Sequence, residues 1–72
     1  MTLAQAKIGS TVTVEKLHLT AALEQRLSIL GLIEHTPLKV ITKKGDGIMV
    51  IMVRGTRLAL GANITKGIEV NA

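Results

Sequence analysis

Residues 20–31 read TAALEQRLSILG and carry the main helical pattern of this chain, whose other segments are patterned as short strands. Thr20 can cap the first turn, because its hydroxyl can accept a hydrogen bond from a first-turn amide. Gly31 can adopt the left-handed conformation that commonly ends a helix. Three leucines are spaced to share one helical face: Leu23, Leu27 and Leu30. We therefore predict a helix over Thr20–Leu30, and we expect it to close an otherwise open set of strands.

The segments on either side alternate apolar and polar residues, which is typical of half-buried strands. Thr11–Leu17 alternates with Val12 and Val14 facing inward, and after the helix Leu38 and Val40 face inward in the same way. The remaining predicted elements are strands at 48–53 and 57–60, one helical turn at 62–66 and a closing strand at 68–70. Four apolar residues outside these elements are expected to anchor the lead-in and the helix end: Leu3, Ile8, Leu32 and Ile33.

Five short strands, tight glycine turns and one helix in 72 residues predict a mainly β fold, a small and strongly bent barrel. The length is that of one domain with one small core, and residues 1–72 are interpreted as that single domain.

Two glycine turns determine the expected register of the middle strands. Gly45 and Gly47 permit a three-residue hairpin loop with a left-handed glycine, and Arg54-Gly55-Thr56 permits a second one. With loops of this length, Val40 and Val50 share the inner face. The third strand is then expected to place Ile48, Val50 and Met52 inside and Met49, Ile51 and Val53 outside.

This register predicts an apolar patch on the outer face of the barrel. Its members would be Ile41, Met49, Ile51, Val53 and Ala59. A small domain rarely leaves such a patch in water without a reason. We interpret it as a docking surface for a partner protein or for another copy of the chain. The alternative is that the helix or a terminal segment folds over this face.

Composition excludes several classes of function. The net charge of +4 favours acidic partners, although the basic residues are scattered. No cysteine is present, so neither a disulfide nor a thiolate metal site can form. The chain also lacks Phe, Tyr and Trp, which removes the usual means of stacking single-stranded bases and of binding proline-rich peptides. Without a membrane-spanning run or a signal-peptide pattern, a cytoplasmic protein is the default expectation.

The sequence indicates no catalytic, cofactor or metal site. His18 and His35 lack a recognised ligand spacing, and we expect them on the surface or in loops. Ser28 lies within the predicted helix, where nothing resembles a nucleophile turn. Asp46 is explained by hairpin turn chemistry, since no helix start or lysine follows it as a phosphate loop would require. We therefore predict that the protein is not an enzyme.

The order of several short motifs resembles the ferrous iron transport protein A (FeoA) family over essentially the whole chain. These motifs are Arg26-Leu27, Leu30-Gly31-Leu32, Thr36, Gly45-Asp46, Leu58-Ala59-Leu60 and Ile68-Glu69-Val70. The resemblance implies a barrel like the Src-homology-3 (SH3) domain, with an inserted helix. It also implies a bacterial, cytoplasmic accessory of ferrous iron uptake that acts on the GTPase domain of the FeoB permease. Arg26 matches a basic position of the family, and it could either contact an acidic partner or cap nearby carbonyls.

The chain departs from the family pattern at several places, among them the turn after the helix, the hairpin proline replaced by Gly47, and the residue after Leu60. Glu34-His35 replaces a Pro-Gly pair, so His35 is expected to adopt a positive φ, which histidine tolerates better than most residues. Gly61 stands where the family has an arginine.

The prediction is therefore a non-enzymatic interaction module that binds a FeoB-type permease, with self-association as a further option. The predicted contact residues are Arg26, Ile41, Met49, Ile51 and Val53. One alternative is a small basic barrel that binds nucleic acid through residues such as Lys43-Lys44; its binding would fall steeply with salt. A second alternative is a detached regulatory domain of the kind joined to metal-dependent repressors.

Overall fold

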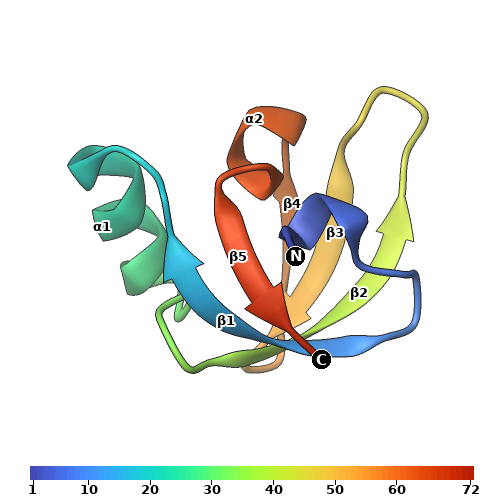
Figure 1. Cartoon of the computed structure of the whole chain (residues 1–72), viewed down its shortest axis with the longest axis horizontal. Coiled ribbons are helices and arrows are strands. Elements are labelled where there is room, and N and C mark those ends of the chain that lie inside the picture. Colours follow the sequence, from blue (N-terminus) through green and yellow to red (C-terminus); the bar gives the residue numbers. More distant parts are fainter.

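The computed structural model describes all residues from Met1 to Ala72 and contains one five-stranded antiparallel sheet. The elements in chain order are η1 (Leu3–Gln5), β1 (Thr11–Leu17), α1 (Ala21–Ile29), β2 (Pro37–Lys43), β3 (Met49–Val53), β4 (Thr56–Leu60), α2 (Ala62–Thr65) and β5 (Ile68–Asn71). The strand order is β4-β3-β2-β1-β5. The sheet curls so that its two edge strands, β4 and β5, approach each other beneath α2 (Figure 1). The five expected strands and the bent barrel are thus confirmed.

The helix α1 forms where the sequence predicts it, with the predicted ends. The Thr20 hydroxyl accepts a hydrogen bond from the Leu23 amide at 3.3 Å, and Gly31 has a φ of +94°. Leu27 is 5% exposed and belongs to the core. Leu30 is not buried in the core, because it is the C-cap of the helix and remains 46% exposed. The helix therefore contributes one buried residue rather than a full stripe.

Thr20→Ala is expected to lower the free energy of unfolding by about 1 kcal/mol, because an amide of the first helical turn loses its acceptor. Thr20→Ser retains the hydroxyl and is the matched control. Urea denaturation of both variants measures the difference. A stability equal to that of the parent in Thr20→Ala would contradict this role of the cap.

The hairpin between β2 and β3 has the predicted three-residue loop, but a β-bulge follows it. The Lys44 amide donates to the Ile48 carbonyl at 2.7 Å, and Gly47 has a φ of +89°. Beyond the loop, Thr42 pairs with Val50, whereas Val40 pairs with Ile51. Ile41 is thus an extra residue on β2, and it shifts the register of the pair by one position.

The turn between β3 and β4 is shorter than predicted. Val53 pairs with Thr56, which leaves a two-residue loop of Arg54 and Gly55. Both loop residues have positive φ, at +50° and +78°, as the tight hairpin turn of that length requires. Met49 and Ile51 therefore face Leu60 and Leu58 across the β3–β4 pair.

The bulge and the short turn reverse the expected face of β3. Met49, Ile51 and Val53 are 2%, 0% and 0% exposed, so their predicted outward placement is wrong. Val50 and Met52 are half-buried and lie on the opposite face. The resulting core has 14 residues: Leu3, Ala6, Val12, Val14, Leu27, Leu32, Leu38, Val40, Met49, Ile51, Val53, Leu60, Ile68 and Val70.

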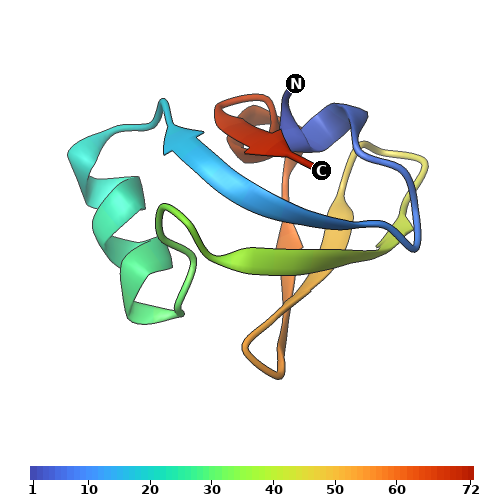
Figure 2. The same ribbon diagram turned by 60° about the horizontal axis from the view of Figure 1, so that its bottom comes forward.

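The barrel is closed by η1 and α2, not by α1 as the sequence suggested. α2 lies between the ends of β4 and β5, whereas α1 stands apart beside the end of β1 (Figures 1 and 2). Leu3 and Ala6 of the lead-in are fully buried, and the Val70 amide donates to the Met1 carbonyl at 2.8 Å. Ile8 is not an anchor, since it is 58% exposed. The two ends of the chain therefore lie together against β5.

Candidate partner-binding surface

A groove of about 570 Å³ runs between α1 and the chain on either side of it. It is lined by Leu17 from the end of β1, by Ala21, Glu24, Gln25 and Ser28 from α1, and by Ile33 and Glu34 from the segment that follows the helix. The groove exists because α1 buries only Leu27, so the flank of the helix stands away from the sheet.

Exposed aliphatic side chains concentrate at the end of α1. Ile29, Leu30 and Ile33 are 79%, 46% and 40% exposed, and they are three of the five large exposed hydrophobic residues of the chain. Leu32 is fully buried, as predicted, but the expected burial of Ile33 beneath the helix end is wrong. The chain reverses direction around Gly31, which turns Leu32 inward and leaves Ile33 at the groove. Fully burying an exposed aliphatic side chain is favourable by about 1.5–3 kcal/mol, and Ile29 has the most exposed surface of the three to bury.

The groove is acidic although the protein is basic. Its only ionisable lining residues are Glu24 and Glu34, and neither forms an ion pair. Glu24 is half-buried, while Glu34 is exposed. A partner group that enters the groove therefore meets two carboxylates together with apolar side chains, and the carboxylates attract cationic groups.

The outer face of β2, β3 and β4 is a second surface with the opposite charge. Met52 lies between Lys39 and Arg57 in one cross-strand row, and Val50 lies between Thr42 and Ala59 in the next. Val50 and Met52 are half-buried, as is Ile41 at the bulge. The sequence predicted an outward apolar patch with Met49, Ile51 and Val53. In the structure, Val50 and Met52 are the β3 residues on that outer face.

The structure does not bring the predicted contact residues together. Arg26 is exposed on the last turn of α1, and Ile41 is half-buried on β2. Met49, Ile51 and Val53 lie in the core, so no partner can reach them in the folded chain. Glu24, Glu34 and Ile33 line the groove but were not predicted as contact residues. A signal was available for Ile33, because Ile29 and Ile33 are aliphatic residues that the leucine stripe does not include.

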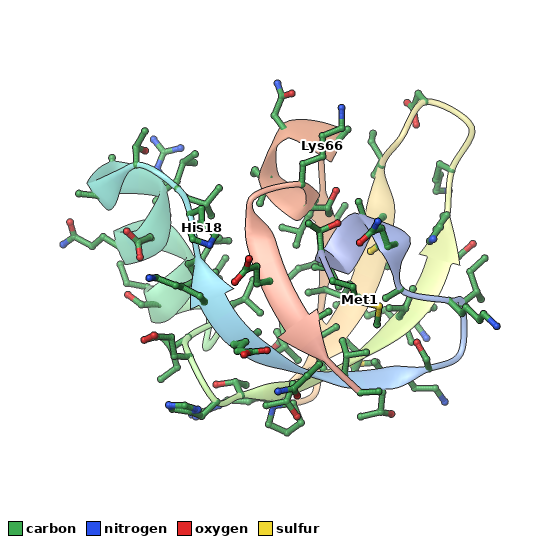
Figure 3. The ribbon with its side chains drawn as sticks, viewed as in Figure 1. Met1, His18 and Lys66 are labelled. Carbon is green, nitrogen blue, oxygen red and sulfur yellow. The ribbon has the colours of Figure 1, made fainter.

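The two histidines are on the surface, as expected. His18 lies at the end of β1, and its Nε2 atom is 3.4 Å from a Glu69 carboxylate oxygen on β5 (Figure 3). His35 is exposed and has the predicted positive φ, at +69°. No three His, Cys, Asp or Glu side chains are grouped so that they could hold a metal ion.

Lys43 of the adjacent basic pair has a structural contact. Its ammonium group donates to the Ala4 carbonyl of η1 at 3.2 Å, across the mouth of the barrel. The residue thereby satisfies an exposed backbone acceptor of the segment that closes the core. No helix of the structure has both the length and the hydropathy needed to cross a bilayer.

Comparison with known proteins gives a family match over the whole chain. The sequence matches the FeoA domain over residues 1–72. No curated protein matches it. Among solved structures, the FeoA protein from Chlorobium tepidum has 30% sequence identity and a TM-score of 0.91, with 97% of this chain and 68% of that chain covered.

Two further structures extend the comparison. FeoA from Stenotrophomonas maltophilia, solved with zinc, is 28% identical with a TM-score of 0.83, covering 99% of this chain and 89% of that chain. It is described as a procaryotic SH3 domain protein, and a role as a ferrous iron transport activating factor was suggested for it. A manganese-dependent transcriptional repressor shares the fold at 17% identity and a TM-score of 0.85, with 94% of this chain and 39% of that chain covered. These likenesses confirm the expected SH3-like barrel.

Proposed function

The chain belongs to the FeoA family, and on that basis we propose that it is a non-enzymatic, cytoplasmic accessory of ferrous iron uptake that binds the GTPase domain of a FeoB-type permease. The observation that carries this proposal is the family match over the full chain together with the exposed aliphatic end of α1, which offers a partner apolar surface.

The proposed mode of action is differential binding. A module without catalytic groups changes a GTPase only if it contacts one of that protein's states better than another. The barrel is suited to this role because its core is apolar and no ionisable side chain is buried, so the charged groups that a partner can contact are on the surface. Arg26 and Ile41 remain proposed contact residues. On β3 we propose the outward-facing Val50 and Met52 as contact residues in place of Met49, Ile51 and Val53, which are buried in the core.

Titration of the full chain into the purified GTPase domain is expected to give one-to-one binding with a dissociation constant of about 1–100 µM, the range of small transient interfaces. We expect the affinities for the nucleotide-free and the GTP-bound domain to differ by about 5-fold or more, which is the size of ordinary coupling between sites. Calorimetry measures both values. No binding to either state, or equal binding to both, would contradict the proposed mode of action.

A second candidate is a detached regulatory domain, because a transcriptional repressor contains the same fold. That likeness shows the fold alone, and this chain spans 39% of the repressor. Two observations disfavour nucleic acid as the partner: the groove beside α1 carries two carboxylates, and Lys43 is engaged by η1.

A further inference from the structure

We propose that the groove beside α1 binds a segment of the partner that carries Lys or Arg side chains next to aliphatic ones. This inference rests on the proposed function and adds to it the surface used and the chemistry of the segment recognised. The proposed occupant is a segment of the GTPase domain that carries both basic and aliphatic side chains, because both carboxylates and apolar side chains line the groove.

The apolar part of the groove is open and unfilled by the chain itself. Leu17 at the end of β1 is half-buried, whereas Ala21 on α1 and Ile33 after the helix are exposed. No other segment of the chain covers these side chains, because the residues that close the barrel lie against β5, away from α1 (Figure 1). An aliphatic side chain of a partner would complete this cluster.

The charges of the groove determine the sign of the partner. Glu24 and Glu34 come from different segments, on α1 and after it, and face a groove that no cation lines. The only ion pair of the structure joins His18 to Glu69, so both groove carboxylates are free to accept a cation. Because Glu24 is half-buried, its interaction with a bound cation is screened less than that of a fully exposed carboxylate.

The groove also discriminates against other occupants. An acidic segment or a nucleic acid would place its charges against two carboxylates, and like charges at an interface disfavour binding. A second copy of the chain could offer Lys44 from its exposed hairpin loop. That occupant is an outcome of the experiment below.

The experiment uses the full chain labelled with ¹⁵N and with ¹³C in its isoleucine methyl groups, titrated with the GTPase domain. We expect the methyl signal of Ile33 and the amides of α1 to shift or broaden first. The methyl signal of Ile8 is expected to stay unchanged, because this 58% exposed residue precedes the start of β1 whereas α1 follows the other end of that strand. Spectra of the labelled chain alone, recorded with increasing amounts of unlabelled chain, show the signal changes that self-association produces.

A charge-neutralised pair tests the carboxylates. The double variant Glu24→Gln with Glu34→Gln is expected to bind the GTPase domain about 2- to 30-fold more weakly at low salt, since each exposed ion pair contributes modestly. The control pair Glu15→Gln with Asp46→Asn removes the same charge elsewhere and is expected to bind like the parent. The difference between the two pairs is expected to shrink at 0.5 M salt, where the Debye length falls to about 4 Å.

The outcomes separate this inference from the proposed function. Binding that is undiminished in the groove pair, or shifts confined to the outer face of β3, would overturn the inference while the proposed function stands. Equal weakening in both pairs would show that net charge alone matters and would also overturn it. Shifts of Ile33 produced by self-titration would assign the groove to a second copy. No binding at all would refute both proposals.

Discussion

Ile51→Ala is expected to lower the free energy of unfolding by about 2–5 kcal/mol, the usual cost of cutting a fully buried isoleucine to alanine. Ile51 is 0% exposed and pairs with Val40 and Leu58 at the centre of the barrel. A domain of this length has a total stability of roughly 4–11 kcal/mol. The variant is therefore expected to unfold at a lower urea concentration than the parent, or to be unfolded already at 37 °C.

Met52→Ala is the matched control, because Met52 is the next residue on β3 and lies on the opposite face. It is half-buried, and its truncation is expected to cost at most about 1 kcal/mol. The comparison tests the register directly. A more severe loss in Met52→Ala than in Ile51→Ala would show that the bulge at Ile41 is misplaced and that β3 has its other face inward.

Gly67→Ala is the second substitution with a large expected effect. A methyl group at Gly67 would lie 2.9 Å from the His18 carbonyl oxygen and 2.7 Å from a Leu19 methyl carbon. The His18 amide also donates to the Gly67 carbonyl, at 2.6 Å, so the two backbone segments cannot separate freely. We expect a loss of about 1–3 kcal/mol, the range for overpacking a close contact.

Gly45→Ala controls for the general effect of replacing a glycine. No atom lies within 4 Å of a methyl group built at Gly45, and its φ is outside the left-handed region. Its stability is expected to equal or slightly exceed that of the parent, because alanine restricts the unfolded chain. Thermal unfolding of both variants gives the comparison. A melting temperature for Gly67→Ala equal to that of Gly45→Ala would mean that His18 and Gly67 are not in contact.

Local chemistry made much of the fold predictable. Thr20 and Gly31 mark the two ends of α1, and both act as their residue types predict. The hairpin loop at Gly45–Gly47 has the predicted length for a similar reason, since its glycine supplies a left-handed residue. In each case the determining interaction lies within a few residues along the chain, so the sequence contains all of it.

The face of β3 could not be predicted, because every residue from Ile48 to Val53 is apolar and alternation gives no preference. Its orientation depends on pairing with two other strands. Ile41 is extruded as a bulge on β2, and the loop at Arg54-Gly55 has two residues rather than three. A single position of slippage in an antiparallel pair exchanges the two faces of a strand. The predicted contact residues Met49, Ile51 and Val53 were wrong for this reason alone.

The groove was unpredictable for a different reason. Glu24 lies on the helix and Glu34 follows it, and nothing in the sequence indicates that they line one hollow. Their proximity arises because the chain turns back at Gly31 and because Leu27 is the only fully buried residue of α1. That arrangement is a property of tertiary packing.

Because β4 and β5 do not pair, the gap between these two strands is the place where we expect local opening of the barrel. No backbone ladder crosses that gap, and the segment that contains α2 connects the two strands. Local fluctuations are cheapest where few backbone hydrogen bonds must break. We therefore expect the barrel to open most readily between β4 and β5. The first residues of the chain lie beside that gap, where the Val70 amide donates to the Met1 carbonyl.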